Sequence, residues 1–225
     1  MSITYNDALN RLKEERCRLS LSQKDMAQYA RINQSNYSKV EQAMRRLSYD
    51  EMKYLCDTEI DVHYIFTGKR GNVCYKELFI ECSYSEAVFY LNMIYSIATF
   101  HGRHKSNDSW KSIYDRIQYV PLLEENQYGK NVFLILRRSM NWQQQKMAHK
   151  LGVDVKKLRD LENGRNLPDS ELLCRLYEVF GIPPALILKD KSGVLSEVSI
   201  LLEMMDRSYK ERVYEALVLL RDIKQ

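Results

Sequence analysis

The chain has 225 residues, of which 45% are hydrophobic, and it carries a formal net charge of +4 at pH 7. This length allows one large or two small domains, and the apolar content is sufficient for packed cores. No apolar run approaches the roughly 18 residues that a membrane-spanning helix needs, and the charged stretch MSITYNDALNRLKEER is unlike a signal peptide. We therefore expect a cytoplasmic protein with no membrane partner, whose five scattered cysteines are reduced thiols.

Glycine (8 residues) and proline (4 residues) are rare, and runs with strand-like alternation are few, so the sequence predicts an all-α fold. The positive charge is concentrated in two regions. Residues 1–71 carry a net charge of +2 and residues 131–190 a net charge of +3, whereas the segments between and after them are close to neutral. This distribution favours a polyanionic partner.

Polar residues that commonly cap helix N-termini divide residues 1–71 into five short predicted helices. The first covers residues 4–18, and the caps of the other four are Ser22, Asn33, Ser48 and Asp61. Asp25 and Glu51 each stand three residues after a serine cap, where the acid of a capping box belongs. Gly68 is expected to end the fifth helix.

Residues 72–129 form a predicted helical spacer, with helices near residues 74–82, 85–100 and 108–119. The stretch AVFYLNMIYSIATF is so apolar that it must be buried, either in the core or against another chain. HGRHKSNDS is typical of an exposed loop, and no zinc-ligand spacing supports its histidines, His101 and His104. We therefore predict no metal site and no cofactor.

Shifting the chain by 121 residues superposes residues 12–68 on residues 133–189 without gaps, and the apolar patterns agree better than the identities do. The second region is expected to repeat the five helices. They cover residues 130–140 and 143–150, then one that Asp154 caps, one that opens at Pro168 and Asp169, and one that opens at Pro183 and Pro184. Two copies are too few for a solenoid, so we interpret residues 1–71 and 130–190 as duplicated domains.

Residues 191–225 form a predicted helical tail of two helices. Ser208 and Glu211 are spaced as a capping box in front of RVYEALVLLRDI, where apolar residues recur at intervals of three and four. This stripe could pack on the chain's own core or form a homodimer interface, and we favour self-packing with a contribution to a dimer.

In each copy the second helix, a turn and the third helix form a helix-turn-helix. The segments LSLSQKDMAQYARINQSNYSKVEQ and MNWQQQKMAHKLGVDVKKLRDLENGRNLPD resemble the lambda-repressor-like, or Xre-type, helix-turn-helix family, and HYIFTG and GIPPALIL resemble its closing helix. The resemblance implies two tandem five-helix domains whose third helices enter the major groove of double-stranded DNA. It also implies structural ion pairs, Arg16 with Glu41 and Arg137 with Glu162.

The outer face of each third helix holds the residues that such a domain uses to read bases. These are Gln34, Ser35, Asn36 and Lys39 in the first copy, and Val155, Lys156 and Lys157 in the second. Gln pairs with adenine, Ser with several base edges and Lys with guanine, while Val meets a thymine methyl. The competing interpretation is a solvated helix face, and Asp160 would repel phosphates near the second copy.

Other residues are expected to contact phosphates. Backbone N–H groups at the start of the second helix favour anions, which places Ser22, Gln23 and Gln144 beside the duplex. Arg45, Arg46 and Arg165 follow the third helices, where phosphate contacts would give affinity and salt dependence but little sequence information. A helix cap, for Ser22, and a solvated basic loop, for the arginines, are the structural alternatives.

These features predict a sequence-specific DNA-binding transcriptional regulator, a repressor from a bacterium or phage. One chain could reach two half-sites, or twice that number as a homodimer. The sequence has no glycine-rich phosphate loop and no nucleophile motif, so we predict no enzyme activity. The alternative is a protein-interaction module, such as an antitoxin or inhibitor, that binds a protein partner and whose second helix-turn-helix does not bind DNA.

Overall fold

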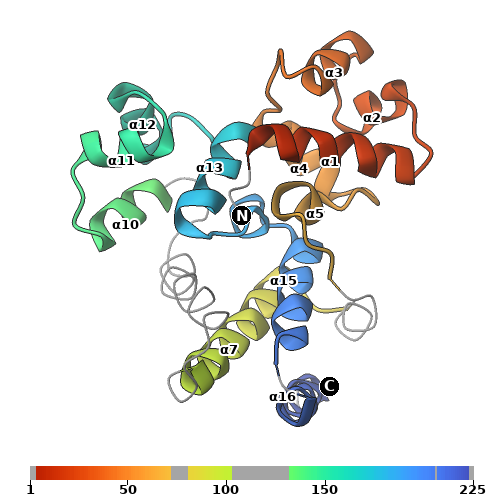
Figure 1. Ribbon diagram of the computed structural model, residues 1–225, viewed down its shortest axis with the longest axis vertical. Coiled ribbons are helices and arrows are strands. Elements are labelled where there is room, and N and C mark those ends of the chain that lie inside the picture. The colour runs from red at the N-terminus through yellow and green to blue at the C-terminus, as the bar shows by residue number, and fades with distance from the viewer. Residues whose placement is uncertain (1–3, 72–80, 103–131, 206, 223–225) are drawn as a thin grey trace.

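The computed structural model describes residues 4–71, 81–102, 132–205 and 207–222 (Figure 1). All regular structure in these four segments is α-helical, which confirms the predicted all-α class. Two helical units lie side by side at the top of Figure 1, and the helices of residues 84–102, 191–203 and 207–222 extend below them. None of the described helices is long and apolar enough to cross a membrane.

The first unit consists of five helices that begin where the sequence predicts them. They are α1 (Tyr5–Arg18), α2 (Gln23–Tyr29), α3 (Gln34–Glu41), α4 (Tyr49–Cys56) and α5 (Val62–Thr67). The predicted caps Ser22, Asn33, Ser48 and Asp61 each accept a hydrogen bond from the backbone N–H three residues further on. Both predicted capping boxes are present, with Asp25 and Glu51 bonded back to the cap residue. A side-chain cap is worth about 1 kcal/mol, so it fixes where such short helices start.

The second unit repeats this plan. Its helices are α10 (Val132–Ser139), α11 (Gln144–Leu151), α12 (Val155–Glu162), α13 (Ser170–Phe180) and α14 (Pro184–Leu188). Asp154 and Asp169 cap α12 and α13 through their side chains, as predicted for Asp154. Gln143 precedes α11 without making a side-chain cap bond. Pro184 occupies the first turn of α14, where the missing N–H of proline costs nothing.

The two units also share four left-handed backbone positions, although Gly181 of the second unit has positive φ and its counterpart in the first, Ile60, does not. Ser20, Arg31, Ala43 and Gly68 have positive φ in the first unit, and Asn141, Gly152, Gly164 and Lys189, each 121 residues later, have it in the second. Non-glycine residues adopt this conformation only rarely, so the four matched pairs indicate one backbone path used twice. Arg31, which stands where Gly152 recurs, places its guanidinium 4.0 Å from the ring centre of Tyr54. This cation–π contact offsets part of the strain, which is about 1 kcal/mol or more.

A buried carboxylate closes the first unit. Glu15 on α1 accepts bonds from Arg18 at 2.7 Å, from Arg70 at 2.5 Å and from the backbone N–H of Asp61 at 2.9 Å. Burial alone would raise the pKa of Glu15, but these bonds outweigh it and lower the pKa to about 2. Glu15 therefore joins α1 to both ends of α5 as an ionised group.

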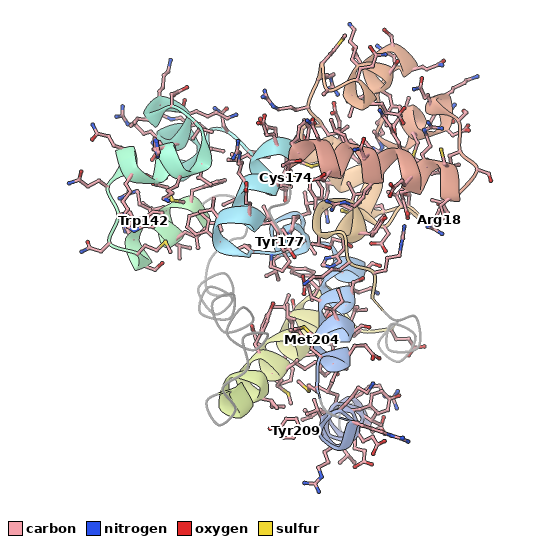
Figure 2. The ribbon with its side chains drawn as sticks, in the orientation of Figure 1. Arg18, Trp142, Cys174, Tyr177, Met204 and Tyr209 are labelled. Carbon is pink, nitrogen blue, oxygen red and sulfur yellow. The ribbon has the colours of Figure 1, made fainter. Side chains whose placement is uncertain are left out.

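The units meet through α1, α4 and α5 of the first unit and α13 and α14 of the second. α13 packs against α1 and α5, and α14 packs against α4 and α5. Figure 2 shows Cys174 and Tyr177 of α13 in the middle of the molecule, between α10–α12 and α1–α5. Both side chains are buried, and burial raises the pKa of the Cys174 thiol to about 12. The junction is therefore part of the protein core.

Below the junction, α15 (Lys191–Glu203) packs against α7 (Tyr84–Gly102), against α5 and α14, and against α16 (Arg207–Asp222). The apolar stretch of α7 buries Ala87, Val88, Tyr90, Leu91, Ile94 and Tyr95. These residues pack within the chain's own core, so the expected burial is confirmed. Phe89, in the same stretch, is 52% exposed.

Asp190 is a second buried carboxylate, at the point where α14 gives way to α15. It is 5% exposed, and burial raises its pKa to about 6. Gly193 makes room for it, because a Cβ atom there would lie 2.5 Å from the Asp190 carboxylate.

The tail shows one error in the predicted helix starts. α16 begins at Arg207, so Ser208 lies inside its first turn and is not the N-cap. Glu211, the expected partner of Ser208, instead accepts a hydrogen bond from Arg207 at 3.1 Å, one helical turn away. That ion pair favours a helix that already includes Arg207. Val213 and Leu217 of the predicted stripe are buried, which agrees with self-packing.

Several spacer predictions cannot be compared with the structure. The expected helices at residues 74–82 and 108–119 and the histidine His104 lie outside the described residues, apart from the last two positions of the first helix. His101 and Gly102, which were predicted to open an exposed loop, are instead the last two residues of α7, so that part of the prediction was wrong. The part of the chain that the structure describes contains no cluster of three residues able to hold a metal ion.

Candidate nucleic-acid interface

Each third helix is held in place by a buried carboxylate at its C-terminal end. In the first unit Glu41, 6% exposed, accepts a bond from Arg16 Nε at 2.8 Å and another from Gln23 Nε2 at 2.8 Å. Arg16 also donates to the carbonyl oxygen of Leu21 at 3.0 Å. Burial by itself would raise the pKa of Glu41, but the bonds from Arg16 and Gln23 hold it below its ordinary value. α3 is thereby fixed to α1 and α2 by a charged group at its inner side.

The second unit contains the same arrangement. Glu162, 4% exposed, accepts bonds from Arg137 and from Gln144 Nε2, the latter at 2.8 Å. Arg137 also donates to the carbonyl oxygen of Trp142 at 3.2 Å. The predicted structural ion pairs are confirmed in both units. The glutamine is a third member that the sequence interpretation missed, although Gln23 and Gln144 each precede their glutamate by 18 residues.

Because Glu41 ties the inner side of α3 to α1 and α2, the opposite face of the helix is directed outward. Tyr37 and Val40 point into the core with no measurable exposure. Gln34, Ser35 and Lys39 are exposed, as a base-reading face requires. Asn36 is half-buried, and its backbone N–H donates to the Asn33 cap. The four predicted reading residues thus lie on one helix, with three of them fully presented to solvent.

The outer face of α12 is more basic than that of α3, and more of its side chains are engaged in contacts within the chain. Val155 is half-buried against the core, and Lys156 is exposed. Lys157 Nζ bonds to the Asp169 carboxylate at 3.0 Å. Arg159 is exposed beside Lys156 and was missed from sequence, although its place on the helix corresponds to Ser38 of α3. Lys156 and Arg159 therefore form the accessible cationic part of this face.

The arginines that follow the third helices all have carboxylate partners. Arg45 binds Glu51 through two bonds of 2.9 and 2.5 Å and is 28% exposed. Arg46 pairs with Glu171 of the second unit and is 55% exposed. Arg165 lies 3.7 Å from Asp160 and is 72% exposed. Arg45 is thus built into the fold of the first unit, whereas Arg46 and Arg165 are open enough to exchange a carboxylate for a phosphate.

The starts of the two second helices differ in charge. The Asp25 carboxylate accepts bonds from Ser22 at the start of α2, and these bonds lower the pKa of Asp25. An ionised carboxylate there opposes a phosphate. The side chains of Gln23 and Gln144 do not distinguish the two helix starts, because each is bonded to the glutamate of its own unit. α11 has no acidic residue in its first turn, and Gln143 in front of it makes no capping bond. The start of α11 is therefore the better anion site of the two.

Residues 135–187, from within α10 to within α14, match the family model described as helix-turn-helix. Proteins use this motif to bind DNA, and the second helix of the pair enters the major groove in such proteins. The corresponding helix in this chain is α12. No curated protein and no solved structure matches the chain. The second unit thus carries a DNA-binding type of motif.

Proposed function

We propose that the protein is a sequence-specific DNA-binding transcriptional regulator that acts as a repressor. It does so through two tandem helix-turn-helix domains, residues 1–71 and 130–190. Residues 72–129 serve as a helical spacer between them, and residues 191–225 as a tail that packs on the core. The bound protein would repress by occupying promoter DNA.

The observation that carries the proposal is a set of contacts that both units have beneath the third helix, α3 or α12. In each unit a buried glutamate accepts bonds from an arginine and a glutamine, and these contacts are called the clamp below. A helix-turn-helix match covers the second unit, and the Arg137–Gln144–Glu162 contacts turn the outer face of α12 toward solvent. The first unit has the equivalent contacts at matched positions, Arg16, Gln23 and Glu41. A buried carboxylate in the same place supports the same use for α3.

In this proposal the first unit is the main base reader. Gln34 bonds to adenine in a bidentate manner, and Ser35, Asn36 and Lys39 contact neighbouring base edges. Lys156 and Arg159 supply cations to the second contact region, where Val155 meets a thymine methyl. Phosphates are bound at the start of α11, near Gln144, and by Arg46 and Arg165 once their carboxylates are displaced. Ser22 at the start of α2 and Lys157 on α12 contribute less to DNA binding, because Asp25 is bonded to Ser22 and Asp169 to Lys157.

Selection from a random duplex library, followed by binding at several salt concentrations, tests the proposal. We expect a defined sequence to be enriched and its affinity to fall steeply with salt. Gln34→Ala should lower the affinity for the selected sequence about tenfold or more and relax specificity at one position, leaving random DNA unaffected. Gln28→Ala, the same change at an exposed site on α2, is the matched control. Equal losses on selected and random DNA would contradict the role of Gln34.

One observation favours the alternative, a protein-interaction module such as an antitoxin or inhibitor. Arg45, Arg46, Lys157 and Arg165 all face carboxylates of the same chain, which leaves fewer cations for phosphates. If no sequence is enriched and binding at about 50 mM salt does not exceed that of random DNA, this alternative replaces the regulator.

A further inference from the structure

The junction between the units is built from equivalent elements that exchange partners. α4 and α13 are the fourth helices of their units, and α5 and α14 are the fifth. α4 packs against α14, α13 packs against α5, and the two fifth helices pack against each other. A two-fold axis produces this pattern in a dimer of identical subunits. Here it occurs within one chain.

Equivalent residues also bridge the junction. Tyr49 and Ser170 are the first residues of α4 and α13 and are 121 positions apart. The Tyr49 hydroxyl donates to the carbonyl oxygen of Ile187 at 3.0 Å. Ser170 Oγ accepts from the backbone N–H of Leu47 at 3.1 Å, and its own N–H donates to the Leu47 carbonyl at 3.0 Å. Matched positions thus tie each unit to the other.

The rest of the junction has the composition of a permanent interface, with an apolar centre and a polar edge. Its centre is apolar, because Leu47, Leu186, Ile187 and Leu188 are at most 5% exposed. Its edge is polar, with Arg46 paired to Glu171, and Lys53 Nζ bonded to the carbonyl oxygen of Lys189 at 3.0 Å. Buried apolar contact of this kind fixes relative position, whereas a linked pair of independent domains would show a smaller and more polar contact.

The two-fold relation between the units is incomplete, both at the junction and on the outer faces of α3 and α12. α1 also packs against α13, where Tyr5 adds a hydroxyl contact of 3.0 Å to Ser170, whereas α10 does not pack against α4 in the same way. The two sides of the junction therefore differ. Figure 1 shows α12 at the upper left and α3 at the upper right of the molecule, with α13 and α1 below and between them. Their outer faces carry unlike residues, Gln34 and Ser35 on one and Val155 and Lys156 on the other.

From this geometry we propose that a single chain is a built-in pseudo-dimer that binds an asymmetric DNA site. This inference rests on the proposed function. α3 and α12 address two unlike half-sites of one duplex at a spacing fixed by the α4–α5 and α13–α14 junction. Since the first contact brings the second reader to its half-site, the second contact is intramolecular and gains affinity of about 10²-fold or more. No second copy of the chain is needed.

The test uses the full chain and the sequence enriched from a random duplex library. We expect a motif of two unlike elements, and one chain per duplex by analytical ultracentrifugation. Gln34→Ala should alter base preference in one element only and Lys156→Ala in the other, with Gln28→Ala altering neither. Inserting about 5 or about 10 base pairs, a half or a whole turn, between the elements should reduce affinity about 10²-fold in both cases, because a fixed spacing cannot follow either change.

Three outcomes would overturn the inference. A palindromic motif bound by two chains would replace it with ordinary dimerisation, while the proposed function would stand. Full tolerance of both insertions would show that the units move independently, again without harm to the proposed function. Enrichment of no sequence at all would refute the proposed function, and the inference with it.

Discussion

Glu162→Gln tests whether the clamp beneath α12 holds the helix in place. The carboxylate is 4% exposed and receives bonds from Arg137, itself 18% exposed, and from Gln144. Breaking a fully buried ion pair costs about 3–5 kcal/mol. Arg137 retains some access to water and the new amide still accepts one bond, so we expect a loss of about 2–3 kcal/mol. Glu178→Gln is the matched control, because that glutamate and its partner are 30% and 47% exposed and their ion pair should contribute less than about 1 kcal/mol.

The assay is urea unfolding at pH 7, followed by tryptophan fluorescence in a Trp110→Phe background. The chain has two tryptophans, so Trp142 then reports on the second unit alone. Its ring lies 5.9 Å from that of Phe180, and its carbonyl oxygen accepts a bond from Arg137, so its environment depends on the fold of this unit. If Glu162→Gln shifts the unfolding midpoint no more than Glu178→Gln does, the clamp does not orient α12, and the main support for the outward reading face is lost.

Further predictions concern the other carboxylates. Glu171→Gln should free Arg46 to bind a phosphate, raise DNA affinity several-fold and steepen the slope of log affinity against log salt concentration by about one. The measurement is filter binding, with Glu178→Gln as the control. Equal effects of the two substitutions would attribute the gain to net charge alone. Because the pKa of Glu15 is lowered to about 2, its contribution to stability is complete above its ordinary value and is lost as pH falls from about 4.5 to about 2. Glu15→Gln should reduce the dependence of the unfolding free energy on pH over that range. An unchanged dependence would contradict an ionised Glu15 in the folded protein. Because the pKa of Asp190 is raised to about 6, stability should decline as pH rises from about 4 to about 6. Asp190→Asn should remove this decline and stabilise the protein at pH 7 by about 2–3 kcal/mol, and thermal melts that show a lower midpoint at pH 7 would refute it.

Helix starts could be predicted from sequence because their causes are local. Ser48 and Glu51 are three residues apart, and the bonds between them exist wherever that turn forms. The ion pair of Arg16 with Glu41 spans 25 positions, and only its recurrence in the second copy, with the family resemblance, made it predictable. Ser208 shows the limit of the local rule, since a competing pair between Arg207 and Glu211 moved the helix start.

The partners of the basic residues could not be predicted in the same way. Glu51 serves both as the capping-box acid and as the carboxylate for Arg45, and spacing indicates only the first of these roles. Arg46 meets Glu171 only because the two units pack together, which no pattern within either unit reveals. The charge available to a polyanion is thus set by the packing of the units, whereas the sequence shows only the total.

The two units differ most where, in the proposed function, they would touch DNA. At the start of α2 the capping box engages two backbone N–H groups: Ser22 N–H donates to the Asp25 carboxylate and Asp25 N–H donates to Ser22 Oγ, which stabilises the helix but withholds both groups from a phosphate. α11 lacks both an acid and a side-chain cap, at a cost of about 1 kcal/mol. A backbone N–H group that is bonded within a capping box is not available to a phosphate, so the start of α11 keeps more such groups for an anion than the start of α2 does. With the polar face of α3 beside the first and the basic face of α12 beside the second, the differences favour more base reading by the first unit and more backbone binding by the second.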